Sequence, residues 1–188
     1  NFNGTQHGYF NLVATIPVEA GDYRITLGTC QYGTGTGAVA NADHTQCVGA
    51  CLDKASSCNV PCVSLELANG KIITGKRSDL FEATSAAIIN ALKYYAKIPD
   101  DLLLLSISVI TPIQNLKKNY LNKDFQRLTL DEVLFALAIT AQNNTMAEKA
   151  LLQIPKLASA QMHSSIMLPS DEVSVLKKLK IDVTTETS

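Results

Sequence analysis

The first stretch of this 188-residue sequence that could bind a ligand is CQYGTGTGAVANADHTQC at 30–47. Its glycines, Gly33, Gly35 and Gly37, follow an alternating apolar run and precede a predicted helix. Backbone N–H groups at the start of a helix can hold a phosphate, and Gly33, Gly35 and Ala38 fit the relaxed dinucleotide pattern G-x-G-x-x-A. The stretch therefore raises the question of a nucleotide site.

Two features favour a structural role for these glycines. A phosphate-binding P-loop requires lysine and then serine or threonine after the last glycine, and here Gly37 is followed by alanine and valine. The acidic candidate for a ribose contact, Asp53, falls within the predicted helix and not at the end of a second strand. We interpret the glycines as a corner between a hairpin and a helix, and rank Gly33, Gly35 and Gly37 behind the next stretch as ligand-binding candidates.

The second stretch, TGKRSD at 74–79, places Lys76, Arg77 and Ser78 between a predicted strand and a predicted helix. Anions bind readily at such a position. The alternative is a solvated turn in which Ser78 or Asp79 caps the helix. We take Gly75, Lys76 and Ser78 as the candidate residues for a small anionic ligand.

The third candidate is His163, in the predicted strand segment MHSSI. Residues two apart on a strand share a face, so His163 would lie beside Ser165. A catalytic pair would also need an orienting acid, which the sequence does not place. His163 is our candidate catalytic residue, and the alternative is a half-buried histidine bonded to backbone.

Five cysteines, at 30, 47, 51, 58 and 62, lie in the first third of the chain. The last four have the spacing C-x3-C-x6-C-x3-C, whereas structural zinc sites usually use a shorter C-x2-C unit. The alternatives are a zinc site, nested disulfides (Cys51 with Cys58, Cys47 with Cys62), or free thiols. We favour free thiols and expect no metal and no cofactor.

The amino-acid composition limits the classes of partner that we expect for this chain. The chain is 46% hydrophobic and 18% charged, its net charge is −1, and its basic residues are scattered. Nucleic-acid binding needs a basic patch or stripe, and a membrane-spanning helix needs about 20 apolar residues in a row. We therefore expect neither nucleic acid nor membrane as a partner.

The hydrophobic pattern predicts an α+β fold, a mixed α/β sandwich in which hairpin–helix units pack with a mixed sheet and several helices. Residues 1–188 would form one domain, with a possible hairpin–helix repeat at 11–55 and 62–97. Asn69-Gly70 predicts the turn of the second hairpin. The run LLLLSISVI at 102–110 predicts a central strand, with a helix opening at Thr111-Pro112. Capping boxes at 129–132 and 145–148 and a cap at Ser170 predict three further helices, and 161–168 and 181–187 predict strands.

The stretch LELANGKIITGKRSDLFEATSAAIINALK resembles the carboxy-terminal part of an uncharacterised bacterial family, domain-of-unknown-function family 1846. So do IPDDLLLLSISVITPIQNLK, LTLDEVLFALAITAQNNTMAEKALLQIPKL, MHSSIML and LKKLKIDVT, in this order. The resemblance covers about 64–185, and 1–60 do not match. It implies a cytoplasmic bacterial protein with no established catalytic residues to carry over.

Three functional hypotheses follow. The first is an oligomerising or small-anion-binding module, which we expect to form a homo-oligomer. The second is a hydrolase acting on a phosphorylated or peptide substrate. The third is a secreted, self-assembling structural subunit, which the cysteines and an amino terminus at Asn1 rather than methionine would suit. The first places the chain in the cytoplasm, the third outside the cell.

Overall fold

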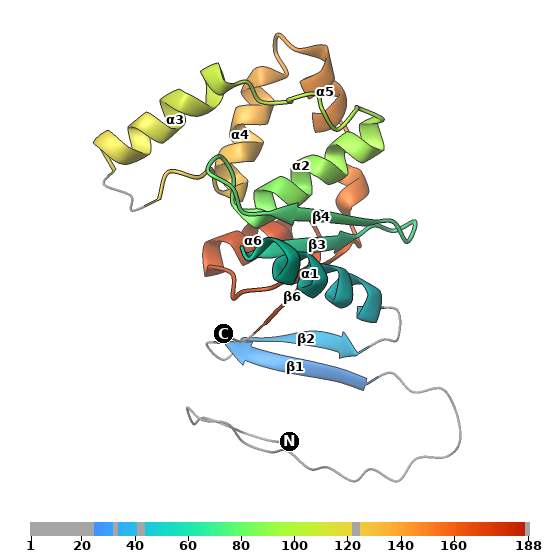
Figure 1. The fold of residues 1–188 in the computed structure, drawn as a ribbon. Coiled ribbons are helices and arrows are strands. Elements are labelled where there is room, and N and C mark those ends of the chain that lie inside the picture. The colour runs from blue at the N-terminus through green and yellow to red at the C-terminus, as the bar shows by residue number, and fades with distance from the viewer. Residues whose placement is uncertain (1–24, 32–33, 41–43, 122–124, 187–188) are drawn as a thin grey trace, which may run out of the picture.

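The computed structural model describes residues 25–31, 34–40, 44–121 and 125–186. These residues form six α-helices, a four-stranded mixed sheet and a separate two-stranded sheet, which confirms the α+β prediction (Figure 1). The elements are β1 Ile25–Gln31, β2 Thr34–Ala40, α1 His44–Cys58, β3 Cys62–Glu66, β4 Ile72–Lys76, α2 Ala83–Ala96, α3 Ile107–Asn119, α4 Leu130–Thr140, α5 Thr145–Leu151, the 3-10 helix η1 Ile154–Leu157, β5 Gln161–Ser164, α6 Ser170–Lys178 and β6 Asp182–Thr185.

The four-stranded sheet has the order β4-β3-β5-β6. Strand β3 pairs antiparallel with β4 and with β5, and β5 pairs parallel with β6 through the crossover helix α6. The predicted turn at Asn69-Gly70 is confirmed: Gly70 has φ 78°, and its N–H donates to the Leu67 carbonyl at 2.8 Å. Glycine suits this position because a side chain strains a backbone with positive φ.

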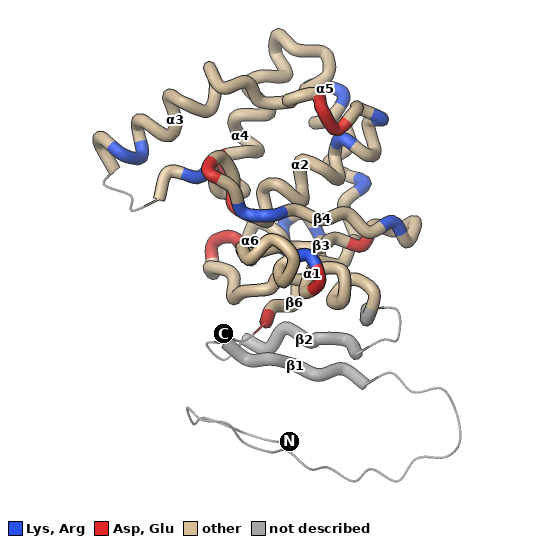
Figure 2. The backbone as a smooth tube through the Cα atoms, in the orientation of Figure 1, with Lys and Arg blue, Asp and Glu red and all other residues tan. Residues whose placement is uncertain are grey.

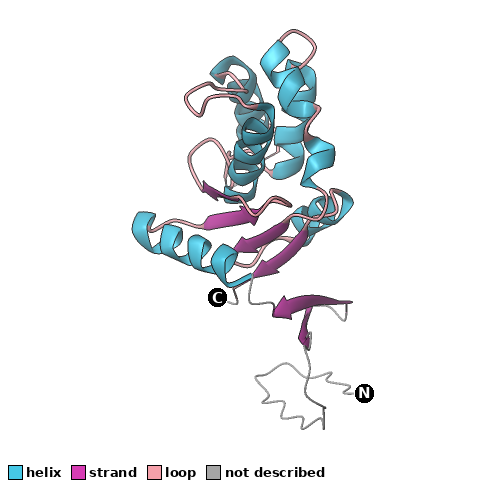
Figure 3. Ribbon diagram, turned by 90° about the vertical axis from the view of Figure 1, so that its right-hand side faces the viewer, coloured by secondary structure: helices cyan, strands magenta, loops and turns pink. Residues whose placement is uncertain are grey.

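Helices cover both faces of this sheet (Figure 3). Helix α1 packs on one face and α2 on the other, with α4 and α5 beyond α2. The side chains of β3 alternate between the two layers. Val63 and Leu65 are fully buried in the main apolar core, whereas Ser64 points to α1 and donates to the Cys47 carbonyl at 2.6 Å.

Strand β4 approaches α2 unusually closely, at Gly75. A Cβ atom on Gly75 would lie 2.5 Å from the carbonyl oxygen of Ala83 and 2.7 Å from the Cα of Ala87. Both are backbone atoms of α2, so no side-chain rotation could relieve the contact. Glycine at this position therefore sets the depth at which the β4–α2 corner packs.

The glycine-rich segment differs from its prediction. We expected a corner, but Thr34–Ala40 forms strand β2, paired with β1 so that Gly35 lies opposite Cys30 and Gly37 opposite Gly28. The interposed threonine, alanine and valine residues suit a strand, and ladder pairing satisfies the backbone that glycine exposes. Gly33 and residues 11–24 lie outside the described residues, so the repeat over 11–55 and 62–97 stays a prediction.

The predicted central strand at 102–110 is wrong. Helix α3 begins at Ile107, and Pro112 lies inside it instead of opening it. Leu104, Leu105 and Ile110 are buried, but Leu103 is 69% exposed, so the apolar run is not covered on both faces as a central strand would be. Local apolar character does not separate a short buried strand from a buried loop leading into a helix.

Helix starts follow the sequence with small shifts. The capping box at 129–132 is present at the start of α4. The second predicted box is replaced by Asn144, whose side chain accepts from the N–H groups of Met146 and Ala147 at the start of α5. Helix α6 has Pro169 in the N-cap position, with Ser170 as its first residue.

Residues of both charge signs are mixed along the described part of the chain (Figure 2). Figure 2 shows lysine and arginine interspersed with aspartate and glutamate along the described chain. Within that part of the chain, no helix has the length and apolar character that crossing a membrane requires.

The Gly75 contact predicts the effect of a single methyl group. Gly75→Ala should lower the free energy of unfolding by about 1–3 kcal/mol, because the β4–α2 corner must open to accept the Cβ. Gly49→Ala is the matched control: Gly49 lies within α1 and has no atom within 4 Å of its added Cβ, so alanine should be neutral or stabilising. Thermal or urea unfolding measures both, and equal stability of the two variants would contradict the close approach.

Candidate functional site

A cavity of about 500 Å³ lies where three parts of the chain meet. Its walls come from the β4–α2 corner, from the end of α3 with the start of α4, and from the loop after β5 with the start of α6. The lining includes Ser164, the last residue of β5, so the cavity lies at the carboxyl end of the parallel β5-α6-β6 unit. Ligands of open α/β sheets bind at such carboxyl ends.

A short parallel bridge brings the first two walls together. Phe81 pairs with Leu128, the Leu128 N–H donates to the Leu80 carbonyl at 2.8 Å, and the Glu82 N–H donates to the Leu128 carbonyl at 3.1 Å. Leu128 is fully buried. The segment that precedes α2 is thereby fixed beside the segment that precedes α4.

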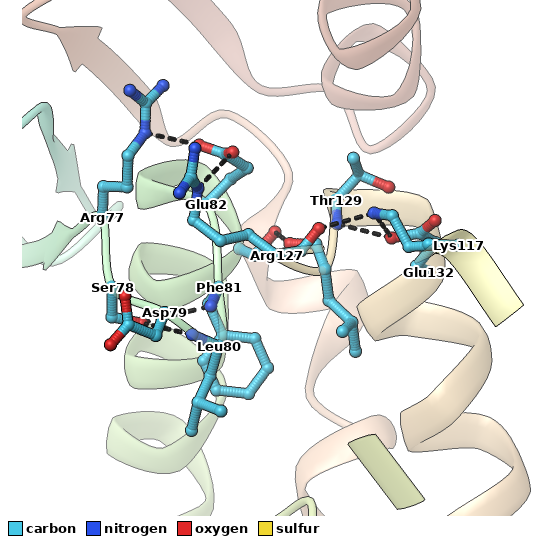
Figure 4. Close-up of polar contacts among 12 residues, drawn as sticks. Arg77, Ser78, Asp79, Leu80, Phe81, Glu82, Lys117, Arg127, Thr129 and Glu132 are labelled. Atoms are coloured by element: carbon cyan, nitrogen blue, oxygen red, sulfur yellow. Dashed lines mark hydrogen bonds and ion pairs between the residues drawn. The ribbon is translucent and has the colours of Figure 1, made fainter. Parts of the chain in front are cut away.

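Glu82, the N-cap residue of α2, joins two arginines across this bridge (Figure 4). Its Oε2 accepts from Arg77 Nε at 2.8 Å and its Oε1 from Arg127 Nε at 2.9 Å. The Glu82 side chain is 13% exposed, so solvent screens these bonds less than at an open surface. A guanidinium group has five N–H donors, and each arginine uses only its Nε–H in the bond to Glu82. The Nη groups therefore remain able to bind a ligand.

A buried lysine secures the neighbouring wall. Lys117 of α3 is 2% exposed, and its Nζ donates to Glu132 Oε2 at 2.7 Å and to the Arg127 carbonyl at 2.5 Å (Figure 4). Glu132 Oε2 also accepts the Thr129 N–H at 2.9 Å, within the capping box of α4. Lys117 thus holds both the start of α4 and the backbone that carries Arg127.

Three helices begin at the cavity: α2, α4 and α6 each contribute residues of their first turn to its lining. The N-terminus of a helix carries a partial positive charge of about half an elementary charge, and its first N–H groups lack partners within the helix. Neither Glu82 nor Pro169 caps its helix through a side-chain bond, so α2 and α6 retain those N–H donors. This geometry favours a negatively charged ligand.

Glu172, in the first turn of α6, lines the cavity and has an altered proton affinity. Burial, the largest cause, raises its pKa to about 7, and the carboxylate of Glu82 adds to the rise. Glu172 Oε1 and Thr84 Oγ1 are both buried without a hydrogen-bond partner in the described structure. A ligand that enters the cavity could supply the missing partners.

The charges of the cavity that are least exposed to solvent sum to a positive value. Asp131 and Asp171 also line it, but both are exposed and therefore screened by water. The less exposed groups are three cations, Arg77, Lys117 and Arg127, against Glu82 and Glu132, with Glu172 partly neutral near pH 7. With Glu172 about half ionised at pH 7, the balance is about half an excess positive charge, and it rises to about one when Glu172 is protonated, before the helix termini are counted.

The structure places the residues of TGKRSD in different settings. Arg77 lines the cavity, whereas Gly75, Lys76 and Ser78 are not among its lining residues. Gly75 packs on α2, and the Ser78 hydroxyl accepts the N–H groups of Leu80 and Phe81 in a turn. The Lys76 side chain is exposed. A ligand role for these three residues stays a prediction.

His163 lies in β5 and is not among the residues that line the cavity, although the next residue, Ser164, is. It is 5% exposed, with Nδ1 at 2.8 Å from Thr184 Oγ1 and Nε2 at 3.2 Å from Glu186 Oε1. Burial lowers its pKa, against the opposing charge of Glu186. Ser165, its predicted neighbour, instead accepts the Cys62 N–H through its hydroxyl at 2.9 Å. The catalytic role of His163 stays a prediction.

The remaining candidates lie elsewhere in the fold. Gly35 and Gly37 belong to β2. Cys47, Cys51, Cys58 and Cys62 are free thiols, and the described residues bring no three of histidine, cysteine, aspartate or glutamate together around a possible metal position. The sequence alone did not single out Arg127 or Glu172. The only local signals were the capping box that follows Arg127 and the acidic first turn of α6.

Comparison with known proteins places the domain in a family. The family model described as "Domain of unknown function DUF1846, C-terminal" matches residues 43–188. This confirms the resemblance over 64–185 and extends it to α1, so 43–60, which we left unmatched, belong to the same domain.

The relatives are bacterial proteins named only as UPF0371 proteins. A relative from Streptococcus thermophilus (strain CNRZ 1066) is 44% identical over 76% of this chain and 29% of its own length. Relatives from Fusobacterium nucleatum and Clostridium botulinum are 44% and 45% identical over 66% of this chain, and 24% and 25% of their own lengths. The chain therefore spans only about a quarter to three tenths of the length of these relatives.

The raised pKa of Glu172 predicts a pH-dependent stability. Its pKa rises from 4.5 to about 7 on folding, so between these values the folded state binds more protons than the unfolded state. The free energy of unfolding should therefore fall as pH rises from about 4.5 to 7, by at most about 3 kcal/mol from this group.

Glu172→Gln tests this dependence, because glutamine is neutral at every pH. Its melting temperature relative to the wild type should be higher at pH 8 than at pH 5. Asp171→Asn, at the exposed neighbouring position, is the matched control and should show a smaller pH-dependent difference. The same pH profile for both variants would contradict the burial of the Glu172 carboxyl group.

Proposed function

This chain belongs to the family of the DUF1846 carboxy-terminal domain, and we propose that in this domain the cavity between α2, α4 and α6 binds a small anionic ligand. The observation that supports the proposal most strongly is the meeting of three helix N-termini with Arg77 and Arg127 at one cavity. Each guanidinium is oriented by its bond to Glu82 and offers a planar pair of N–H donors. Such pairs match phosphate and carboxylate oxygens in a bidentate manner.

Glu172 and Thr84 add a second recognition element. Near pH 7 the Glu172 carboxyl is partly protonated, so it can donate a hydrogen bond as well as accept one. An anionic group at the arginines and a hydroxyl or amide group at Glu172 and Thr84 would together satisfy the cavity. We infer a ligand of metabolite size that carries a phosphate or carboxylate and at least one uncharged polar group.

Isothermal titration calorimetry with inorganic phosphate, pyrophosphate and succinate tests the proposal. At least one of the three should bind, and Arg77→Gln and Arg127→Gln should each weaken binding about 10–100-fold, the loss of one charge-assisted hydrogen bond. Lys76→Gln is the matched control: it removes a positive charge one residue from Arg77 but outside the lining, and should change the dissociation constant less than about twofold.

The outcomes separate the candidates. Equal affinity of all three variants, or no heat with any of the probes, would exclude this cavity as an anion site. A larger effect of Lys76→Gln than of Arg77→Gln would instead support the set Gly75, Lys76 and Ser78. Circular dichroism melts of the variants distinguish loss of binding from loss of folding.

Binding of an anion should also depend on pH. Sulfate is a suitable probe, because it keeps two negative charges over the range measured and any pH dependence then comes from the protein. Protonation of Glu172 removes a negative charge from the cavity, so the affinity for sulfate should rise as pH falls from 8 to 6. In Glu172→Gln this dependence should be lost. A wild-type affinity that is flat or falls towards pH 6 would contradict a neutralisable carboxyl group beside the anion.

Hydrolysis of a phosphorylated or peptide substrate is the second candidate function, and Glu172 is the observation that favours it. A carboxyl group with a pKa near 7 in a cavity suits general acid–base catalysis. Release of phosphate from p-nitrophenyl phosphate is a direct assay, in which Glu172→Gln should abolish turnover while His163→Gln tests the residue chosen from the sequence. The expectations of a homo-oligomer, of no nucleic-acid partner, and of a cytoplasmic or secreted location stay predictions.

A further inference from the structure

Two cysteine thiols lie next to one another at the junction of α1 and β3. Cys58 is the last residue of α1, Cys62 is the first of β3, and their Sγ atoms are 3.3 Å apart. Asn59 follows the helix with φ 51°, the left-handed conformation that often ends helices, and Pro61 precedes the strand. The two sulfur atoms are therefore held together by a tight, conformationally restricted link.

Cys62 is the fixed member of the pair. It is fully buried, its N–H donates to Ser165 Oγ at 2.9 Å, and its carbonyl accepts the Ser165 N–H at 3.0 Å and the Cys51 thiol at 3.2 Å. Cys58, by contrast, is half-exposed, and its thiol donates to the Lys54 carbonyl within the last turn of α1. A small oxidant can reach Cys58 from solvent but not Cys62.

The pKa values of the two thiols also distinguish Cys58 from Cys62. Desolvation acts to raise the pKa of Cys58, but the hydrogen bond from Cys62 and the charges of Lys76 and Lys54 outweigh it and lower that pKa. Burial and the neighbouring Cys58 raise the pKa of Cys62 to about 12. Because the thiolate is the reactive form of cysteine, Cys58 is the nucleophile and Cys62 the partner that resolves its oxidation product.

We propose that Cys58 and Cys62 are a modification site that hydroperoxides convert into an intramolecular disulfide. The Cys58 thiolate attacks the terminal oxygen of the hydroperoxide, its O–O bond breaks, and the leaving alkoxide or hydroxide takes up a proton to give an alcohol or water. Cys58 is then a sulfenic acid. The Cys62 sulfur displaces the sulfenic oxygen, the S–S bond forms, and that oxygen leaves as water with the Cys62 proton and one further proton from solvent or its own hydroxyl group.

The second step needs only a small movement. A disulfide has an S–S distance of about 2 Å, so the two sulfur atoms must approach by roughly a further ångström through side-chain rotation. Cys47 and Cys51 do not compete for the oxidant, since both are buried and their thiols are hydrogen-bonded to Ser64 and to the Cys62 carbonyl. Burial raises the pKa of both, to about 11 for Cys51. This inference does not depend on anion binding at the cavity.

Peptide mapping of the intact 188-residue chain tests the proposal without ambiguity. Trypsin cuts after Lys54 and Lys71 and not between the two thiols, so peptide 55–71 carries Cys58 and Cys62 and no other cysteine. After mild hydrogen peroxide treatment and alkylation under native and then denaturing conditions, this peptide should lose two hydrogen atoms and take up no alkyl group. Prior reduction should restore both alkylation sites.

Single variants assign the two steps. Cys62→Ser should accumulate a sulfenic acid on Cys58 that dimedone traps, and Cys58→Ser should lower the rate of peroxide consumption at least about tenfold. Cys51→Ser is the matched control: a serine hydroxyl can donate the same bond to the Cys62 carbonyl, so disulfide formation should proceed at the wild-type rate. Circular dichroism of each variant confirms that it is folded.

Three results would overturn the proposal. One is a peptide 55–71 that remains fully alkylated until all cysteines oxidise together. Another is a cross-link between this peptide and the one that carries Cys47 and Cys51. The third is Cys62→Ser behaving like the wild type in the dimedone assay.

Discussion

The shared carboxylate of Glu82 is the interaction on which the candidate site depends. It binds Arg77, just after the end of β4, and Arg127 on the approach to α4, which lies 45 residues from Glu82 along the chain. The pair of arginines would repel one another in its absence, since two like charges near a common point in a partly buried region are unfavourable. Glu82 therefore does more than neutralise charge: it allows two guanidinium groups to be held near each other with their Nη atoms available.

The backbone around Glu82 explains why its position is well defined. The bridge between Phe81 and Leu128 fixes the residue before it, and Gly75 lets β4 pack directly on the first turns of α2. The Arg77 N–H donates to the Pro61 carbonyl at 2.9 Å, in the link between the two thiols of α1 and β3. The thiol pair and the cavity are thus built on one continuous hydrogen-bonded framework, although their chemistry differs.

Local signals in the sequence were enough to predict several elements. The Asn69-Gly70 turn, helix α2 and the capping box at 129–132 depend on residues close to one another in the chain, and all three are present. The fold class follows from the order of such elements. The run at 102–110 failed because apolar content alone does not report whether both faces are covered, and Leu103 is left exposed.

Most residues of the candidate site could not be predicted from the sequence. Arg77 was noticed only as part of TGKRSD. The capping box after Arg127 and the acidic first turn of α6 indicated helix starts but no binding role, because the roles of Arg127 and Glu172 arise from tertiary contacts. The distance along the chain between Glu82, Arg127 and Glu172 is large, and only the packing of α2, α4 and α6 brings them to one cavity. The glycine-rich segment shows the converse: a pattern with a known phosphate-binding use is here part of a strand pair.

Two lysines illustrate how the domain uses positive charge in its interior. Lys93 is 5% exposed and its Nζ donates to the Asp100 carbonyl at 2.6 Å, as Lys117 does to the Arg127 carbonyl. Each ammonium group therefore donates a hydrogen bond to a loop carbonyl that has no partner in a helix or a sheet, and so holds that loop in place. Amine-acylating reagents will label the exposed lysines first, and the appearance of label on Lys93 or Lys117 would report the opening of the loop that each one holds.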